Sequence, residues 1–365
     1  MTMAQKTLKQ TPLYQEHVAL NARIVPFGGW EMPVQYAGIL AEYEHTRKAV
    51  TLFDTCHMGE FLVHGDCRES GLEKIVTMPL ADMPLKSCRY GMTLNDHGGV
   101  IDDLIVFREE KEKWFIVVNG ATTAKDARHF RSRLKHPEVF EDVSASIGKI
   151  DVQGPLSREV LKRYVPDIGK LAYYTFDHFN LGGERVLISR TGYTGELGYE
   201  IYSSAKTVSA IWRELLKNKE ATPAGLGARD MLRLEAGYSL YGHELNEDVT
   251  PLEAGLGKFV DFTKEFIGKE ALLEQKKEGL KRVIAGFVSD TRRAPRQDNK
   301  IYTLTGEQIG VVTSGTFSPL RQKGIGLGFV PPACAQKGVD IFFGEEKNAA
   351  KITGRTFYQN NSLKE

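Results

Sequence analysis

An acidic pair interrupts one of the most apolar stretches of the sequence. Asp102 and Asp103 lie within Val100–Phe107, and all the remaining residues of this stretch are apolar. Successive residues of a strand point to opposite faces of a sheet, so one carboxylate lies on each face. A carboxylate in such a strand must be paired, lie at a strand end or face a cavity. Asp102, nearer the Gly98–Gly99 turn, can be a solvated strand-end residue. Asp103 is the better candidate for a functional acid, with a satisfied structural Asp as the alternative.

Two arginines follow the glycines of segment 223–237. Arg229 falls in the first turn of a predicted helix, and Arg233 lies one turn later. A cation in the first turn opposes the helix dipole, and the second arginine adds a like charge to the same face. The pair makes sense if an anion or a planar polar ligand meets the guanidinium groups. A salt bridge between domains is the alternative.

Three further residues have the chemistry to hold a flat polar ring. Tyr193 lies in a glycine-rich turn between two strands, Glu200 lies in the strand that follows, and Tyr90 precedes another turn. A plain hairpin and ordinary core packing are the alternatives. His57 and His243 are the obvious general bases, but neither accompanies an H-E-x-x-H or G-x-S-x-G motif. We therefore leave both histidines outside the catalytic set.

Strand-like and helix-like segments alternate in the same order twice before residue 281. Two successive β-α-β-β-α runs predict an α+β fold with a duplicated split β-α-β unit. After Lys281, short strands at regular spacing predict a small antiparallel barrel. We expect a region 1–272 of two α+β subdomains, a charged linker 273–281 and a barrel domain 282–365. The expected strands are 61–63, 100–107, 114–118, 147–152, 185–190, 198–203, 282–288, 309–313, 326–330, 339–343 and 351–357, and the expected helices are 68–78, 123–134, 155–164 and 205–216.

Composition argues against several classes of partner. The 48 Lys and Arg nearly cancel the 47 Asp and Glu, so no global field favours nucleic acid or an anionic membrane. No apolar run approaches the ~18 residues that cross a bilayer. The N-terminal residues lack the apolar core of a secretory signal. The four cysteines lack C-x-x-C spacing and no metal constellation is visible, which suits a cytoplasmic protein without a metal.

Taken together, the segments resemble the T-protein (aminomethyltransferase) family of the glycine cleavage system. The matching stretches run in order across about nine-tenths of the chain, which is far more specific than any single motif. They are TPLY (11–14), FGGWEMPVQY (27–36), FDTCHMGEF (53–61), GGVIDDLIV (98–106), VVNGATTAKD (117–126), SRTGYTGELGYEI (189–201), PAGLGARDMLRLEAG (223–237), FIGKEAL (266–272) and TSGTFSP (313–319).

The resemblance implies a reaction, its partners and a fold. An aminomethyl group arrives on the lipoyl arm of the H-protein, and tetrahydrofolate accepts its methylene. The products are 5,10-methylenetetrahydrofolate, ammonia and the dihydrolipoyl H-protein. The implied fold has three domains, two folate-binding α+β portions and a C-terminal β-barrel, around a central folate channel.

The resemblance also implies residue roles. Asp103 lies beside N5 of folate and Glu200 binds the amino-pyrimidine edge of the pterin, while Arg229 contacts the pterin from the other side. Tyr90 and Tyr193 line the ring, Asn119 lies near it, and Tyr358 corresponds to a C-terminal ligand contact. Because an unperturbed Asp has a pKa of about 3.9, we expect an ionised Asp103 with electrostatic and positioning roles. Cys56 and Gly120 depart from the commoner Ser and Ala of the family.

Other activities on this scaffold have their own signatures. Folate-binding proteins of iron–sulfur maintenance or tRNA modification carry a K-G-C-x-x-G-Q-E-like segment, but residues 264–270 lack its cysteine. Demethylating oxidoreductases add a flavin domain, and a sulfonium demethylase is a further alternative. A non-catalytic folate-binding scaffold would lose the acid at position 103. For the H-protein, Arg292, Arg293 and Arg296 are a candidate docking cluster, with a solvated loop and contacts to folate's glutamate tail as alternatives.

Overall fold

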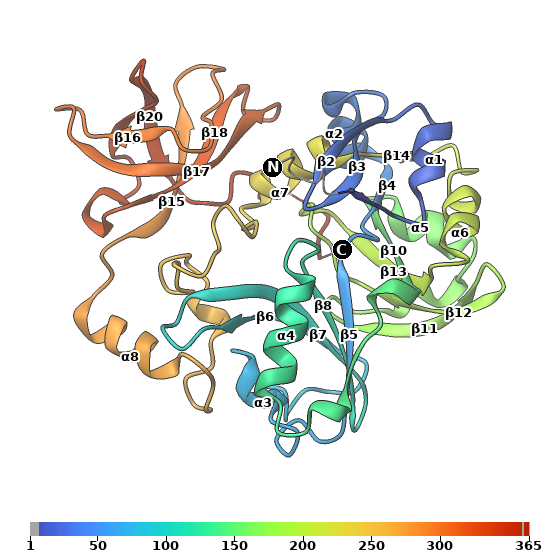
Figure 1. The fold of residues 1–365 in the computed structure, drawn as a ribbon. Helices are drawn as coiled ribbons and strands as arrows, with labels where there is room; N and C mark the ends of the chain where they lie inside the picture. Colours follow the sequence, from blue (N-terminus) through green and yellow to red (C-terminus); the bar gives the residue numbers. More distant parts are fainter. Residues whose placement is uncertain (1–6, 360, 365) are drawn as a thin grey trace, which may run out of the picture. The chain divides into compact units, whose positions relative to one another are not determined.

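The chain divides into two compact units that are each built from separate segments. The computed structural model describes residues 7–359 and 361–364, so part of the N-terminal stretch expected to lack a signal lies outside it. Unit 1 comprises residues 1–60, 142–230 and 361–365, and unit 2 comprises residues 61–141 and 231–360. The chain therefore passes four times from one unit to the other (Figure 1). The expected boundaries at residues 272 and 281 stay a prediction.

Unit 1 contains two sheets. The smaller has the order β1-β3-β2, and the larger has the order β11-β12-β13-β10-β4-β14. The elements are β1 (Lys9–Gln10), α1 (Tyr14–Ala19), β2 (Arg23–Phe27), β3 (Trp30–Gln35), α2 (Ile39–Lys48), β4 (Val50–Asp54), β10 (Ile147–Gln153), α5 (Ser157–Lys162), β11 (Phe176–Leu181), β12 (Glu184–Ser189), β13 (Gly198–Ser204), α6 (Val208–Leu215) and β14 (Ala221–Pro223), and helix α7 (Leu226–Ala236) begins here.

The two faces of the larger sheet differ in chemistry. On one face, Ile150 of β10 and Ile201 of β13 join a core with α5 and α6 that includes the fully buried Trp212. Because side chains alternate along a strand, the residues between them point to the other face. There β10 carries Lys149 and Asp151, which are buried although they are charged. This second face is where unit 1 places its polar groups.

Unit 2 contains a five-stranded sheet of order β6-β7-β8-β5-β9, covered on one face by two helices. Leu104 and Val106 of β7 pack there with Phe130 of α4 and Leu72 of α3. The elements are β5 (Gly59–His64), α3 (Leu72–Ile75), β6 (Cys88–Leu94), β7 (Val100–Glu110), β8 (Lys113–Val118), α4 (Thr123–Arg133) and β9 (Phe140–Asp142).

The predicted duplication is confirmed by strand order. The run β5-α3-β6-β7-β8-α4-β9 forms a sheet ordered β6-β7-β8-β5-β9. The run β10-α5-β11-β12-β13-α6-β14 forms the corresponding order β11-β12-β13-β10-β14, with β4 inserted between the last two. Each repeat thus has two more strands than the sequence pattern indicated, β6 and β9 in the first and β11 and β14 in the second.

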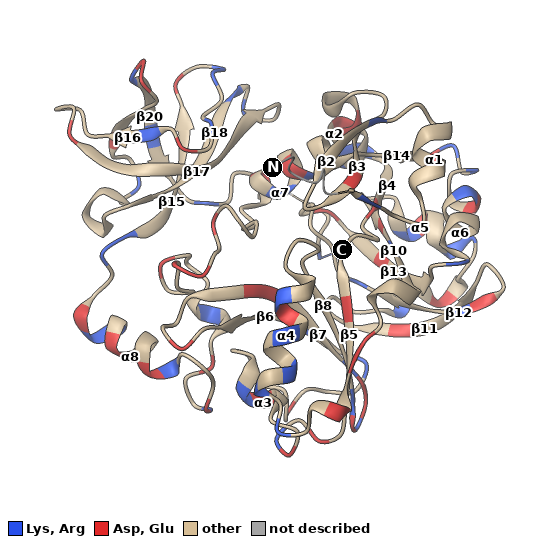
Figure 2. Cartoon of the chain, viewed as in Figure 1, with Lys and Arg blue, Asp and Glu red and all other residues tan. Residues whose placement is uncertain are grey.

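The C-terminal part of unit 2 is a closed six-stranded barrel of order β15-β18-β17-β16-β19-β20, as expected for the fold class. The sequence predicted five of its strands and missed β16. Before it, helix α8 (Lys269–Glu278) exposes charged residues of both signs (Figure 2). The barrel strands are β15 (Val283–Ser289), β16 (Lys300–Tyr302), β17 (Gln308–Ser318), β18 (Lys323–Val330), β19 (Asp340–Phe343) and β20 (Asn348–Thr353).

The helix expected over residues 68–78 was wrong in length. Only Leu72–Ile75 is helical, because Gly71 before it has φ 88° and Val76 after it is extended. Val76 bridges to Thr93, and the N–H of Thr77 donates to the carbonyl of Met92 at 2.9 Å. Pairing with β6 therefore replaces the predicted helical turns.

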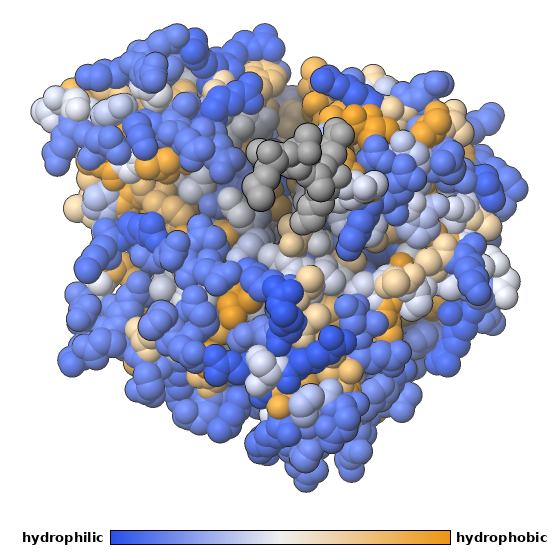
Figure 3. Space-filling model, viewed as in Figure 1, coloured by the Kyte–Doolittle hydropathy of each residue, from blue (hydrophilic) through white to orange (hydrophobic). Residues whose placement is uncertain are grey.

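The surface follows from the composition. Figure 3 shows mostly hydrophilic residues on the face in view, with apolar residues scattered among them. Over the described ranges 7–359 and 361–364, no helix is both long and apolar enough to cross a bilayer.

The end of β10 gives a test of how tightly unit 1 is built. Gly154 has φ 132°, and a Cβ there would lie 2.2 Å from the carbonyl oxygen of Ala49. We expect Gly154→Ala to lower the free energy of unfolding by roughly 2–4 kcal/mol, because overpacking adds to left-handed strain. Gly183 is the matched control, with φ 84° and nothing within 4 Å of an added Cβ. Urea unfolding of both variants makes the comparison, and equal losses would contradict the packing argument.

Candidate active site

The predicted site residues other than Tyr358 fall into two groups, one in each unit. In unit 2, β6 and β7 pair antiparallel, with Met92 opposite Asp103 and Tyr90 opposite Ile105. Tyr90 and Asp103 are thus diagonal neighbours on one face. The Tyr90 hydroxyl donates to Oδ2 of Asp103 at 3.0 Å, and Nδ2 of Asn119 donates to Oδ1 at 2.9 Å. The structure brings these three predicted residues together.

Asp102 points to the opposite face, toward α4. It is fully buried, and it accepts hydrogen bonds from the backbone N–H and Nδ2 of Asn119 and from the Thr122 hydroxyl, each at 2.9 Å. The interpretation of Asp102 as a solvated strand-end residue was therefore wrong. Asp102 holds Asn119 in place, because the backbone N–H and the side-chain amide of Asn119 both donate to it. This fixes the Asn119 amide with its nitrogen toward the two carboxyls.

Three carboxyl groups in this region have raised pKa values. Burial and then the neighbouring Asp102 raise the pKa of Asp103 from 3.8 to about 7. Burial raises the pKa of Asp126 on α4 to about 7, and burial with the charge of Asp126 raises the pKa of Asp102 well above its ordinary range. The expectation that Asp103 is simply ionised at neutral pH is thus corrected. It is divided between its two forms there and can exchange a proton.

In unit 1, the other predicted residues meet a line of alternating charges. Nη1 of Arg229 donates to Oδ2 of Asp151 at 2.7 Å, and Nζ of Lys149 donates to Oδ1 of Asp151 at 2.8 Å. The same ammonium lies 3.2 Å from Oε1 of Glu200. The Tyr202 hydroxyl donates to Oε2 of Glu200 at 2.8 Å. Arg229 and Glu200 are therefore connected through Asp151 and Lys149.

Tyr193 completes this group from the turn before β13. The guanidinium carbon of Arg229 lies 4.9 Å from the centre of the Tyr193 ring and 5.8 Å from that of Phe53. Stacking and the ion pair with Asp151 fix the guanidinium plane. Arg229 thus has a partner within its own unit, so a salt bridge between domains is not needed to explain its place in the first turn of α7.

The remaining candidates have separate environments in unit 2 and unit 1. Arg233 is buried and paired with Glu244 at 2.9 Å, a structural role. The N–H of Tyr358 donates to the carbonyl of Glu235 at 2.9 Å, beyond the last barrel strand. His243 contacts the carbonyl of Thr313 through Nδ1 at 3.0 Å, and burial lowers the pKa of His57 to about 4. Leaving both histidines outside the catalytic set stays a prediction.

Cys56, the departure from the commoner Ser, packs against the backbone of β10. Its Sγ donates to the carbonyl of Lys149 and accepts from the N–H of the same residue, each at 3.2 Å. Burial raises the pKa of this thiol well above its ordinary range. A buried neutral thiol in these contacts is a packing residue rather than a nucleophile.

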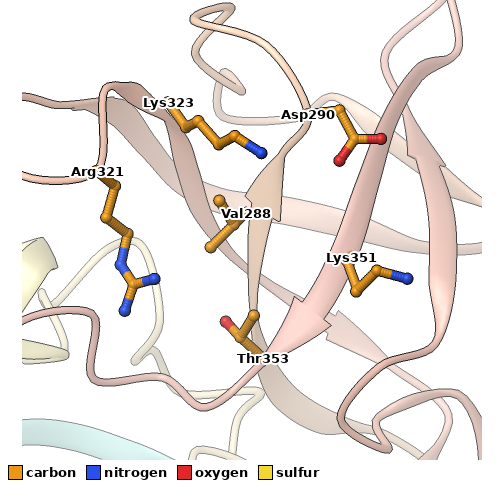
Figure 4. A pocket seen from close by; sticks show the side chains of 6 residues that line it. All are labelled: Val288, Asp290, Arg321, Lys323, Lys351 and Thr353. Atoms are coloured by element: carbon orange, nitrogen blue, oxygen red, sulfur yellow. The ribbon is translucent and has the colours of Figure 1, made fainter.

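A pocket of about 400 Å³ opens on the barrel of unit 2 (Figure 4). Lys351 is paired with Asp340, and the guanidinium of Arg321 donates to the carbonyl of Phe357 at 2.9 and 3.1 Å. None of the predicted site residues lines this pocket, and no tyrosine is among its lining residues. The lining residues are Val288, Asp290, Arg321, Lys323, Lys351 and Thr353.

Metal ligation has no obvious place among the described residues of either unit. Within residues 7–359 and 361–364, no group of three or more His, Cys, Asp or Glu side chains is arranged to hold a metal ion. Asp102 and Asp103 instead share the Asn119 side-chain amide as a donor, and Asp102 also accepts from the Thr122 hydroxyl.

Sequence reasoning missed Lys149, Asp151, Tyr202 and Asp126. A signal was present for the first two, because Lys149 and Asp151 alternate with apolar residues in the strand 147–152 and therefore share a face. Tyr202 has the same spacing from Glu200 on β13. Asp126 gave no such signal, since an acid in the first turn of a helix is ordinary.

The raised pKa of Asp126 makes a prediction about stability. The folded protein keeps its proton up to about pH 7, whereas an unfolded chain loses it near 3.8. The unfolded state therefore binds fewer protons in this window, and this carboxyl makes the free energy of unfolding fall by about 1.4 kcal/mol per pH unit. We expect Asp126→Asn to flatten that decline in urea unfolding between pH 4 and pH 7.

The control for Asp126→Asn is Asp298→Asn, which removes an exposed carboxyl at a backbone φ of 67° that Asn readily adopts. It should leave the decline as steep as in the parent. Equal slopes for the parent and Asp126→Asn would contradict the assignment of a raised pKa to this group.

Comparison with known proteins covers nearly the whole chain. Residues 13–264 match the GCVT N-terminal domain, and residues 282–359 match the glycine cleavage T-protein C-terminal barrel domain. The aminomethyltransferase of Pseudothermotoga lettingae is 43% identical over 88% of this chain and 89% of its own. That of Caldanaerobacter subterraneus subsp. tengcongensis is 41% identical over 98% of each chain.

A solved structure is similar to this chain in fold. The crystal structure of the glycine cleavage system aminomethyltransferase T from Bartonella henselae superposes with a TM-score of 0.89, at 30% identity, over 97% of this chain and 99% of that chain. With both domain models matched in order and full-length relatives above 40% identity, the chain belongs to the glycine cleavage T-protein family of aminomethyltransferases.

Proposed function

We propose that this protein is the aminomethyltransferase of the glycine cleavage system. It transfers the methylene of an aminomethyl group, carried on the lipoyl arm of the H-protein, to tetrahydrofolate. The products are 5,10-methylenetetrahydrofolate, ammonia and the dihydrolipoyl H-protein. The observation that carries the proposal is a carboxyl of raised pKa, Asp103, held by Tyr90 and Asn119 in a chain of this family.

The proton balance of the reaction gives Asp103 a task. Two carbon–nitrogen bonds form at the folate, so its N5 and N10 each lose a proton. One proton ends on the dihydrolipoyl sulfur and the other on the departing ammonia. A carboxyl with a pKa of about 7 takes up and returns a proton readily at neutral pH. We assign this relay to Asp103 at N5, in addition to electrostatic stabilisation of the electrophilic carbon.

Tyr90 and Asn119 keep the Asp103 carboxyl in place. Each donates to one of its oxygens, which leaves further lone pairs of both oxygens for the substrate. Asn119 is itself fixed by Asp102. Their role in the proposal is to orient Asp103 and to lie against the pterin, so that little reorganisation is needed when the substrate reacts.

The unit 1 group suits the pterin ring. The Glu200 carboxylate can accept two parallel hydrogen bonds from an amino-pyrimidine edge, much as a carboxylate does from a guanidinium group. Arg229 supplies a cationic plane fixed over the Tyr193 ring. We propose that Glu200, Arg229 and Tyr193 bind the pterin, and that Tyr358 is a further ligand contact.

The partner side of the proposal concerns the barrel. Arg292, Arg293 and Arg296 are exposed in the loop after β15. Arg292 lies 4.7 Å from the centre of the Phe317 ring, and Arg293 pairs with Glu346 at 2.6 Å, so both have a partner on the barrel. An exposed basic cluster on a chain of net charge +1 can provide a local steering field. We propose that it guides H-protein docking in the cytoplasm, and that no metal takes part.

The role of Asp103 is tested by Asp103→Asn, which keeps the shape and removes the titrating group. We expect ammonia release from aminomethylated H-protein in the presence of tetrahydrofolate to fall by ~10²-fold or more. The rise of the parent rate through about pH 7 should disappear with it. Folate affinity, measured by calorimetry, should change much less.

Asp102→Asn is the comparison for Asp103→Asn. It removes a carboxyl that faces α4 and holds Asn119. The variant should therefore be less stable and slower, because Asn119 is no longer fixed. Its rate should still rise through about pH 7, because Asp103 is retained. Near-full turnover of Asp103→Asn would contradict the assignment of the proton relay to Asp103. So would a rise of the rate through about pH 7 that remained in Asp103→Asn and was lost in Asp102→Asn.

The docking cluster is tested by replacing Arg292, Arg293 and Arg296 together with Gln. The apparent KM for the H-protein should rise and its dependence on salt should flatten, because exposed charges act mainly on association. Lys276, Lys277 and Lys281 are the matched control, since their replacement by Gln removes the same charge from another exposed region. If the arginine variant instead lost folate affinity and kept its salt dependence, contacts to folate's glutamate tail would replace docking.

A further inference from the structure

Lys149 is the buried cation of a four-residue block on the polar face of the unit 1 sheet. Strands β10 and β13 pair antiparallel, with Lys149 opposite Tyr202 and Asp151 opposite Glu200. All four side chains share one face because each pair is two residues from the next. The side chain of Lys149 is only 1% exposed, and that of Asp151 is fully buried. The block thus places two carboxylates directly across from each other inside the protein.

Such a pair is unstable without compensation. Like charges directly opposite in a sheet repel, and burial of an ion costs several kcal/mol unless partners offset it. Lys149 supplies the compensation, at 2.8 Å from Asp151 and 3.2 Å from Glu200. Arg229 adds a second cation at 2.7 Å from Asp151. Two cations therefore balance two anions.

The titration of the block agrees with this balance. Burial lowers the pKa of Lys149, but Asp151 and Glu200 outweigh it, so the pKa lies above 10.5. Burial raises the pKa of Asp151, but Lys149 and Arg229 bring it to about 2. Both groups are charged throughout the neutral range.

Other titratable groups around the block do not disturb its charge count. Burial raises the pKa of Glu60 well above its ordinary range, and neither of its carboxyl oxygens has a hydrogen-bond partner within the described residues. Burial also lowers the pKa of His57 to about 4 and raises the pKa of Tyr202 well above 10. His57 and Tyr202 are neutral at pH 7, and burial disfavours the charged form of Glu60, which leaves Lys149 as the ammonium that faces Glu200.

The geometry of Glu200 defines what a ligand can do. Lys149 occupies one site on Oε1 and the Tyr202 hydroxyl occupies one site on Oε2. An ionised carboxylate has about four acceptor sites, so one remains on each oxygen. The two remaining sites can accept a pair of parallel N–H donors and cannot donate in return.

We propose that Lys149 is the positioning residue that sets the specificity of the pterin site, by keeping Glu200 ionised and fixed so that it accepts only a ring edge with two N–H donors. This inference rests on the proposed function, because it concerns the amino-pyrimidine edge of tetrahydrofolate. Without Lys149, the repulsion from Asp151 places a proton on Glu200. A protonated carboxyl offers one donor in place of an acceptor and opposes that edge.

The test is the pH dependence of tetrahydrofolate affinity, measured by calorimetry under reducing conditions from pH 6 to pH 9. Affinity of the parent protein should be flat over this range. Lys149→Met should bind more weakly than the parent protein, most of all at pH 6. Its affinity should recover as pH rises, because the proton on Glu200 must leave before the ligand binds. Glu200→Gln should be weak and flat at every pH.

A charge-balanced variant guards against a simple loss of folding. Lys149→Met/Asp151→Asn removes one charge of each sign, so Glu200 has no opposing carboxylate and the pH dependence should vanish. Far-UV circular dichroism and urea unfolding establish that each variant is folded.

The outcomes separate this inference from the proposed function. If the tetrahydrofolate affinity of Lys149→Met did not depend on pH, whether weakened or not, the positioning role would be overturned. Lys149 would then have only the structural role of an ion pair. An affinity of the double variant that still depended on pH would also overturn the positioning role. A parent protein that failed to bind tetrahydrofolate would instead overturn the proposed function.

Selectivity gives a second readout. A tetrahydrofolate analogue without the 2-amino group loses one of the two donors, and a site built for that group should reject it strongly. The parent should prefer tetrahydrofolate by at least ~10-fold, and Lys149→Met at pH 7 should lose that preference. Equal preference in the parent and in Lys149→Met would contradict the inference.

Discussion

The cost of burying a carboxylate is the constraint on which both site groups depend. An ionised carboxyl away from water needs a cation, hydrogen-bond donors or a proton. Unit 1 uses cations, since Lys149 and Arg229 hold Asp151 and Glu200 in their charged forms. Unit 2 surrounds Asp102 and Asp103 with neutral donors, and their pKa values rise. One solution gives fixed charges that suit recognition, and the other gives a group that exchanges protons.

The duplicated sheet explains how one chain supports both solutions. In each repeat, helices cover one face of the sheet with apolar side chains. The opposite face carries the polar groups, namely Lys149, Asp151 and Glu200 in one repeat and Tyr90 and Asp103 in the other. Since a strand fixes the direction of every second side chain, a few substitutions on that face change the chemistry without disturbing the packed one. Asp102 is the exception that reaches into the packed face.

The sequence was sufficient for the fold class, and it named candidate residues that the structure brings together, such as Tyr90, Asp103 and Asn119. Asp103 became a candidate because an acid in an apolar strand is costly, and the resemblance supplied the roles of Glu200 and Arg229. Which face of β7 is more deeply buried depends on how α4 packs, so the burial of Asp102 could not be read from its neighbours. Strand β16 has three residues, too few to display an alternation. The raised pKa of Asp103 comes first from burial, which depends on tertiary packing that no local pattern encodes.

The interleaved path of the chain affects how the protein is made. Unit 1 takes its segments from residues 1–60, 142–230 and 361–365, and Ser362 donates from its hydroxyl to Glu196 at 2.6 Å. The ribosome releases the first of these segments long before the last one exists. Domains usually fold during synthesis in the order in which they emerge, but unit 1 also includes residues 361–365, which emerge after the segments of unit 2. A nascent chain arrested before residue 361 therefore lacks the contacts of Ser362 with Glu196 and Leu197, whatever the duration of the arrest.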